Sequence, residues 1–275
     1  MEQERSHKNF STTTANAAQQ SSKIISTATG HTLTTVQQTN NSSVVVWGTN
    51  LESGVGKGKI TNVVRKMYDL PRYQSSVILG LLLSDGWTIY SSSTRKSGVD
   101  ESKLNARLGF KQSLDKFYYF FSVFNDLAHY CSSFPYLNTG KRNNTITYAL
   151  VFQTRALPCL TKYHQLFYVN GKKIVPKDIY NLLDPVVLTH WICGDGVAKT
   201  GGLGLCTDSY SIEEVVKLVN VLIIRYRFIC KIREIRKNQY RIFISEKSLG
   251  SLRNIVLPYI DKSMLYKIDH LIIKN

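Results

Sequence analysis

Two apolar segments that each end in Asp-Gly constrain the fold of this chain more than any other feature. VILGLLLSDG runs from Val77 to Gly86, and VVLTHWICGDG runs from Val186 to Gly196. Similar helical and strand-like patterns follow both segments in the same order, and the two Asp-Gly pairs lie 110 residues apart, at positions 85 and 195. Internal similarity of this kind indicates a repeated structural unit. We therefore expect two related halves rather than one irregular domain.

The patterns between the two segments predict a mixture of strands and helices. Strict alternation over LNARLGFKQS, Leu104 to Ser113, predicts a strand with one buried face. The distance from Asp85 to Ser113 is 28 residues, whereas that from Asp195 to Ser209 is 14, so the first half carries an extra loop near Ser91 to Glu101. The remaining predicted elements of the first half are a helix over Phe117 to Leu127, a strand over Ile146 to Thr154 and a helix over Ala156 to Phe167. Those of the second half are GLGLCTDS from Gly202 to Ser209, a helix over Ile212 to Tyr226, strands near Cys230 to Ile235 and Tyr240 to Ser245, and a helix around Leu249 to Tyr259.

Each apolar segment reads as a helix that is buried on every face, because no polar stripe interrupts it. Gly80 costs such a helix about 1 kcal/mol relative to Ala, a cost that is commonly offset where another backbone approaches closely. Two helices packed side by side would bring Asp85 and Asp195 together at their negative ends. Two such carboxylates need a proton or a cation between them, and oxygen ligands suit Mg²⁺ or Ca²⁺. The alternative is that each Asp-Gly only ends a helix with a left-handed glycine.

ILGLLLSDG and LTHWICGDG resemble the two motifs of single-chain LAGLIDADG homing endonucleases, which are encoded within introns of fungal mitochondrial genes. The resemblance extends over roughly Pro71 to Asn275. It implies an α+β fold of two pseudo-symmetric αββαββα repeats, each with a four-stranded antiparallel sheet, joined at the paired motif helices. It also implies a monomer with an internal pseudo-dimer, whose sheets form a saddle over the DNA major groove.

The family resemblance also implies the site. Asp85 and Asp195 would hold Mg²⁺, with Mn²⁺ as a substitute, and Ser84 and Gly194 would lie beside them as metal ligands. A lysine from each half would sit near the metals, and the matching positions are Lys173 in NGKKIVP and Lys267 in SMLYKI. Both lysines could equally be solvated surface residues.

The predicted function is site-specific double-strand DNA cleavage by Mg²⁺-dependent two-metal hydrolysis, which promotes intron homing in mitochondria. Family members sometimes assist splicing instead, so the alternative is a maturase that binds its host intron RNA. A DNA-binding repressor without chemistry is a third possibility, although it leaves the paired Asp-Gly helices without a purpose.

The predicted site also includes residues at the interface of the two motif helices and residues on the sheets that contact DNA. Gly80 and His190 occupy matching positions of the two motifs and are predicted at the helix interface, where His190 is a core histidine rather than a ligand. Aromatic residues from Phe117 to Phe124 follow helical spacing and are predicted to be core. The residues predicted to contact DNA are Asn105, Arg107, Lys111, Arg233 and Arg241, which lie on strand-like segments.

Charge and composition agree with a nucleic-acid partner. The formal net charge is +16, and residues 1–43 contribute only +1 of it, so the basic surface belongs to the folded part. Residues 1–43 contain 25 Ser, Thr, Asn and Gln and are predicted to be disordered, either as an extension or as a transit peptide. No apolar run is long enough to span a bilayer, and five cysteines without a C-x-x-C pair argue against a disulfide framework or a structural zinc site.

The domain boundaries follow from these patterns. SGVGKGKIT, Ser53 to Thr61, lacks the first Gly and the final Ser or Thr of a phosphate-binding loop, so it is predicted to be a flexible basic linker. We expect an extension and linker over residues 1–70, a first repeat over 71–180 and a second repeat over 181–275.

Overall fold

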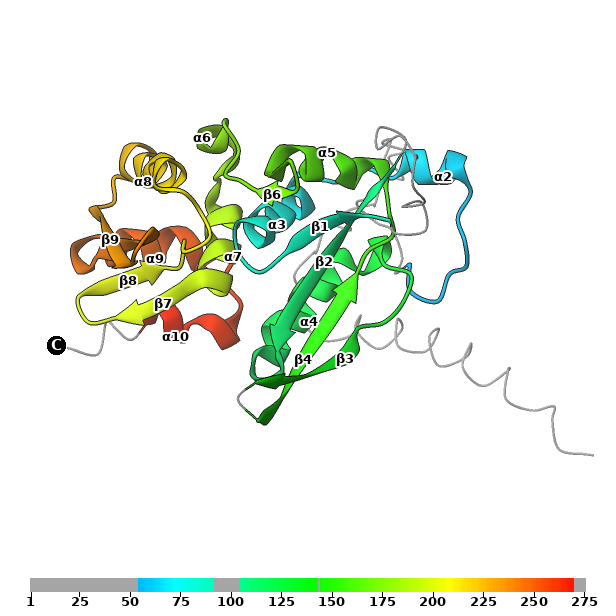
Figure 1. Ribbon diagram of the computed structural model, residues 1–275, viewed down its shortest axis with the longest axis horizontal. Coiled ribbons are helices and arrows are strands. Elements are labelled where there is room, and N and C mark those ends of the chain that lie inside the picture. The colour runs from blue at the N-terminus through cyan, green and yellow to red at the C-terminus, as the bar shows by residue number, and fades with distance from the viewer. Residues whose placement is uncertain (1–53, 92–103, 143, 270–275) are drawn as a thin grey trace, which may run out of the picture. The chain divides into compact units, whose positions relative to one another are not determined.

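The computed structural model describes residues 54–91, 104–142 and 144–269 (Figure 1). The chain divides into two units, Met1–Val44 and Val45–Asn275, and every described residue belongs to the second. The predicted extension over residues 1–43 and nearly all of the predicted extra loop of the first half lie outside the described residues.

The first half begins with α3 (Arg72–Leu83), which carries the first motif. The elements that follow it are β1 (Trp87–Tyr90), β2 (Ala106–Ser113), α4 (Phe117–Leu127), β3 (Tyr136–Arg142), β4 (Thr145–Gln153) and α5 (Pro158–Phe167). A short hairpin, β5 (Tyr168–Val169) with β6 (Lys172–Lys173), and the helix α6 (Ile179–Leu182) lead to the second half.

The second half repeats this order from α7 (Pro185–Asp195), which carries the second motif. Its further elements are β7 (Gly196–Lys199), β8 (Gly202–Leu205), α8 (Ile212–Tyr226), β9 (Cys230–Arg236), β10 (Gln239–Ser245) and α9 (Leu249–Val256). The last described elements are the short 3₁₀ helix η6 (Lys262–Met264) and α10 (Tyr266–Asp269). Among the described residues, no helix combines the length and apolarity that a membrane crossing requires.

Each half contains one four-stranded antiparallel sheet, with strand orders β1-β2-β4-β3 and β7-β8-β10-β9. The sequence patterns alone missed β1, β3 and β7. β3 reads YLNTGKR, whose Asn, Gly and Lys break the apolar alternation, and β1 and β7 have only four residues each. The α+β fold with two four-stranded antiparallel sheets, which the family resemblance implied, is confirmed.

The alternation of β2 separates the two faces of the first sheet. Ala106, Leu108 and Phe110 are fully buried, whereas Arg107 and Lys111 remain accessible. α4 and α5 both contact β2 and cover its buried side. The opposite face of the sheet is therefore open and basic.

The aromatic helix α4 is only partly core. Tyr119, Phe120 and Phe124 are buried, and Phe120 stacks on Phe110 of β2 with ring centroids 5.8 Å apart. Phe117 and Tyr118 are 44% and 74% exposed, so the prediction that they belong to the core is wrong. The helix buries one face only, and Phe117 and Tyr118 lie on the other face.

The segment that precedes α3 is attached to the first repeat. Arg155 donates hydrogen bonds to the backbone oxygens of Gly54, Lys57 and Gly58, at 3.1, 2.5 and 3.0 Å. The short helix α2 (Asn62–Met67) follows this contact. In the part that is described, the predicted linker is thus held by specific hydrogen bonds rather than being free of the fold.

Candidate active site

The two motif helices pack against each other at the centre of the described structure, where α3 and α7 are in contact (Figure 1). Eight consecutive residues of each helix are buried, Ser76–Leu83 and Val186–Cys193. A Cβ added to Gly80 would lie 2.6 Å from His190 Cβ and 2.7 Å from the Val187 oxygen. Gly80 is therefore a point of close approach between the two helices, and a side chain there would push them apart.

The ends of the two helices bring the two motif acids into one neighbourhood. A Cβ added to Gly194 would lie 2.4 Å from Ser84 Cβ and 3.3 Å from Asp85 Oδ2, so the end of α7 touches the end of the first motif. Burial raises the pKa of Asp195 to about 7, and the charge of Asp85 adds to the rise. Two carboxylates in this arrangement repel each other unless a proton or a cation intervenes.

The two Asp-Gly glycines do not adopt the left-handed conformation of a common helix cap. Gly196 has φ −69° and ψ 133°, and Gly86 is absent from the described residues with positive φ. A Cβ on Gly196 would lie 2.4 Å from the Ile192 oxygen, and one on Gly86 would lie 2.9 Å from the Leu81 oxygen. The chain folds back tightly onto each helix end, and the alternative explanation by a left-handed cap is wrong.

Lys173 lies at the end of the first motif. The hairpin β5–β6 turns through Asn170 and Gly171, both with positive φ. This turn places Lys173 at the ends of α3 and α7. Its Nζ donates hydrogen bonds to the Ser84 and Gly86 oxygens at 3.0 and 2.9 Å. Burial lowers the pKa of Lys173 to about 8, opposed by the charges of Asp195 and Asp85.

Lys267 holds the end of the second motif in a related but different way. Its Nζ donates to the backbone oxygens of Ile192, Cys193 and Gly194, at 3.2, 2.5 and 3.1 Å. Lys267 is only 6% exposed, and burial lowers its pKa. An ammonium group has three donors, and all three are used here.

Gln112 is a site residue that the sequence reasoning missed. It lies at the end of β2 and donates a hydrogen bond from Nε2 to Asp85 Oδ2 at 2.6 Å. Gln112 shares the register of Leu108 and Phe110, which face the core. A polar residue at an inward position of an alternating strand was the available signal.

The residues present fit a hard divalent cation with few protein ligands. Among the described residues, no group of three or more His, Cys, Asp or Glu side chains could surround a metal ion. Two carboxylates, backbone oxygens and room for substrate phosphate are, however, the usual surroundings of Mg²⁺. The oxygens of Ser84 and Gly194 already accept from the two lysines, although a carbonyl has two lone pairs.

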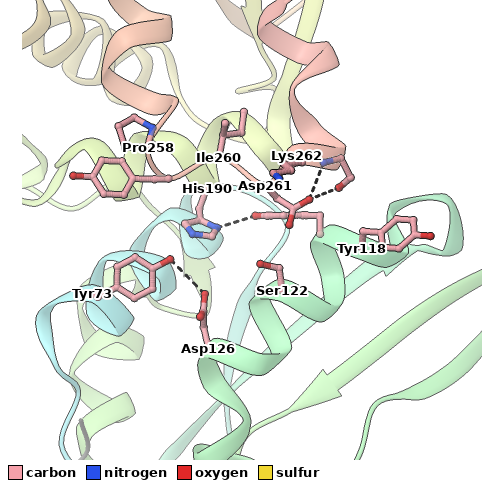
Figure 2. A pocket seen from close by; sticks show the side chains of 12 residues that line it. Tyr73, Tyr118, Ser122, Asp126, His190, Pro258, Ile260, Asp261 and Lys262 are labelled. Atoms are coloured by element: carbon pink, nitrogen blue, oxygen red, sulfur yellow. Dashed lines mark hydrogen bonds between the residues drawn. The ribbon is translucent and has the colours of Figure 1, made fainter. Parts of the chain in front are cut away.

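His190 is a buried core residue, 4% exposed, at the crossing of the helices. Its Nδ1 lies 3.0 Å from the hydroxyl oxygen of Tyr119, and burial lowers its pKa to about 4. Figure 2 shows His190 among the side chains that line a pocket between α4 and the segment Pro258–Ser263. The pocket is not lined by Asp85, Asp195, Lys173 or Lys267, so it is separate from the site of the two motif carboxylates.

The predicted DNA-contacting residues of the first half are divided between two surroundings. Arg107 donates to Ser91 Oγ at 2.7 Å, and Lys111 donates to Asn138 Oδ1 at 2.9 Å, both on the open face of the sheet. Asn105 precedes β2, and its Oδ1 lies 3.5 Å from Thr161 Oγ1 of α5. Asn105 thus lies next to α5, directly before the strand that carries Arg107 and Lys111.

In the second half, Arg233 and Arg241 are direct cross-strand neighbours on one face of the sheet. The Arg233 guanidinium lies 3.8 Å from the centre of the Phe243 ring. Arg241 instead donates from Nε to Asp208 Oδ1 at 2.7 Å and forms a bidentate ion pair. The sequence pattern could not separate these two arginines, because Asp208 reaches β10 only through the fold.

Comparison with known proteins identifies the family. Residues 75–252 match the LAGLIDADG DNA endonuclease family, and the chain belongs to it. The family that the two motifs indicated, and with it the class of DNA-cleaving enzymes, is thereby confirmed.

Individual relatives agree with this assignment. The chain is 29% identical over 217 residues to cytochrome b mRNA maturase bI2 of Debaryomyces hansenii, covering 77% of this chain and 79% of that protein. It is 33% identical over 107 residues to intron-encoded endonuclease ai4 of Dictyostelium discoideum, covering 38% and 67%. The solved structure of the homing endonuclease I-WcaI bound to its DNA recognition sequence has the same fold, with TM-score 0.67, 24% identity and coverage of 78% and 95%.

Proposed function

We propose that the protein is a site-specific endonuclease that cuts both strands of a long, asymmetric DNA target and so promotes intron homing. The observation that carries the proposal is the meeting of two acids and two lysines at the ends of the paired helices. The charges of Asp85, Lys173 and Lys267 all act on the pKa of Asp195. Perturbed ionisable groups that converge in this way are typical of catalytic sites.

In this proposal Asp85 and Asp195 hold Mg²⁺, for which Mn²⁺ substitutes, and the backbone oxygens of Ser84 and Gly194 lie beside them. When bound, such an ion supplies charge that stabilises the attacked phosphate and acidifies water. Asp85 is kept in place by the hydrogen bond from Gln112. Asp195 has a pKa near 7, so it is only partly ionised at neutral pH until a cation is present.

The two lysines have unequal roles in the proposed reaction. Lys173 uses two of its three donors on the Ser84 and Gly86 oxygens, which leaves one N–H for a phosphate oxygen or a water. Lys267 has no donor left, because three backbone oxygens of the second motif accept from it. We therefore assign contact with the phosphate to Lys173 and fixation of the second motif to Lys267.

The open faces of the two sheets form the proposed DNA surface. Arg107 and Lys111 project from the first sheet and Arg233 from the second, where each can neutralise phosphate or read a base edge. The two faces carry different side chains, which supports an asymmetric target. We propose that the protein acts as a monomer, since both motif acids come from one chain, and that it acts in mitochondria.

The proposal is tested by incubating the purified protein with a randomised plasmid library, with and without Mg²⁺, and sequencing the linear ends. We expect recurrent, Mg²⁺-dependent ends at one sequence. Asp85→Asn and Asp195→Asn should each reduce double-strand cutting at least about a hundredfold, the usual scale for losing a catalytic electrostatic contact, while DNA binding persists. Full cutting by either variant would refute the assigned roles.

A maturase is the second candidate, because the relative from Debaryomyces hansenii that bears this name matches over 217 residues. A maturase would bind its host intron RNA and accelerate splicing. An in vitro splicing assay with that intron measures this directly. Salt-sensitive RNA binding with faster splicing, and no recurrent DNA ends, would favour the maturase over the endonuclease.

A further inference from the structure

Two residues of the second repeat form hydrogen bonds with the first repeat. Tyr210 is buried directly before α8, and its hydroxyl donates a hydrogen bond to the Leu83 oxygen at 3.1 Å. Leu83 is the last residue of α3 and lies two positions before Asp85. The bond therefore holds the end of the first motif helix from outside its own repeat.

Glu214 holds the neighbouring chain segment that carries Lys173. Its Oε1 accepts a hydrogen bond from the Val175 N–H at 2.9 Å, and its Oε2 accepts from the Ser211 N–H at 2.8 Å. Glu214 is only 8% exposed, so each carboxylate oxygen needs such a partner. Val175 lies two residues after Lys173 in the chain, and a shift of Val175 would move Lys173.

Among the described residues, no side chain of the first repeat is hydrogen-bonded to the end of the second motif. Lys267 is fixed by three backbone oxygens of the second motif itself. α4 stands in the first half where α8 stands in the second, and its buried Tyr119 hydrogen-bonds to His190, not to the segment around Lys267. The two ends of the site are thus built differently.

We propose that the start of α8 is a positioning device for one half of the site, in which Tyr210 fixes the end of the first motif and Glu214 fixes Lys173. This inference rests on the proposed endonuclease function. Its consequence is selective, because loss of either contact loosens the half with Asp85 and Lys173 and leaves Lys267 in place. An enzyme with one impaired half nicks one strand and leaves the other intact.

The test compares Glu214→Ala with Ser211→Ala in the full-length protein. Ser211 caps α8 by accepting from the Glu214 N–H, so its loss weakens the helix start but retains the bond from Val175 to Glu214. A role of Glu214 in helix capping alone would make the two variants equivalent. If Glu214 also positions Lys173, Glu214→Ala should have a larger effect than Ser211→Ala.

The first readout is hydrogen–deuterium exchange of the peptide that contains Val175, which needs neither metal nor DNA. We expect exchange at least about tenfold faster in Glu214→Ala and within about twofold of wild type in Ser211→Ala, since exchange reports local opening. Equal acceleration in both variants would overturn the proposal.

The second readout is the rate of cutting of each strand, measured in single turnover on a target labelled separately at either strand. We expect one strand to be cut at least about tenfold more slowly in Glu214→Ala, while the other strand changes by less than about twofold, as for loss of orientation at one catalytic group. Equal slowing of both strands would overturn the proposal.

Tyr210→Phe provides a variant that removes only a hydroxyl, in case Glu214→Ala does not fold. Cutting of the same DNA strand should be slowed by about threefold, the scale of one neutral hydrogen bond. An unchanged ratio between the cutting rates of the two strands would count against the inference. If the wild-type protein cuts no target, the endonuclease proposal fails, whereas the exchange comparison still decides whether Glu214 positions the Lys173 segment.

Discussion

At the scale of the residue, buried polar groups in the helix pair are stabilised by partners that only the fold supplies. His190 has Tyr119 at 3.0 Å from Nδ1, and its Nε2 is buried without a partner among the described residues. Protonation would place a charge in this interior that Asp184 and Asp261 offset only in part. The pKa near 4 expresses that cost, since a histidine in water titrates near 6.5.

The lowered pKa of His190 predicts a pH dependence of stability. Between pH 6.5 and pH 4 the unfolded chain binds a proton at this position and the folded chain does not, so stability falls as the pH falls through this window. We expect His190 to contribute a loss of about 2 kcal/mol in the free energy of unfolding between pH 7 and pH 5. His190→Gln should lack this part of the loss.

Urea denaturation of both proteins at the two pH values measures the difference. Asp195, whose raised pKa acts in the opposite direction because it favours the folded state at low pH, is common to both and cancels in the comparison. An identical loss of stability in wild type and His190→Gln would contradict the prediction.

At the scale of the element, close packing of α3 against α7 decides whether glycine at position 80 stabilises or destabilises the protein. Ala at position 80 would favour an isolated helix by about 1 kcal/mol. In the fold, however, the added Cβ would lie 2.6 Å from His190 Cβ and 2.7 Å from the Val187 oxygen, where backbone cannot easily move. We expect Gly80→Ala to destabilise the protein by about 2 to 4 kcal/mol, as in other overpacked cores.

Gly250 in α9 provides the matched control. A Cβ there would meet nothing within 4 Å, so Gly250→Ala should stabilise the protein by up to about 1 kcal/mol through helix propensity alone. Denaturant midpoints of the two variants give the comparison. Changes of the same sign would show that the contact between α3 and α7 does not set the effect at position 80.

At the scale of the whole molecule, a net charge of +16 is distributed over a fold with two open sheet faces. Arginines on these faces differ in how far they are already neutralised. Asp208 compensates Arg241 through two hydrogen bonds, whereas Arg233 lies over the Phe243 ring and forms no ion pair within the described part of the chain. Their contributions to DNA binding should therefore differ.

We expect Arg233→Ala to weaken DNA binding and to lower the dependence of log K on log salt concentration by about 1, because one phosphate contact releases about one counterion. Arg241→Ala should change this slope by less than half as much, since its charge is balanced by Asp208. Binding measured across a salt series decides the point. Equal slopes for the two variants would contradict the unequal roles.

The sequence by itself determined the parts of this protein that depend on local pattern and duplication. The alternation of Leu108 and Phe110 with Arg107 and Lys111 predicted a strand with a basic face, and the all-apolar motifs predicted buried helices. The matching positions of Asp85 and Asp195 indicated the family. These features are readable because hydrophobic period and repeated spacing are properties of the chain itself.

Only the tertiary structure decided how the site is assembled. β3 has no clear alternation, and it forms because β4 offers it an antiparallel partner. Gln112 meets Asp85, Asp208 meets Arg241, and Glu214 meets Val175 across 27, 33 and 39 positions of the chain. Contacts at such separations depend on helix packing and sheet register, which set distances that no local pattern contains.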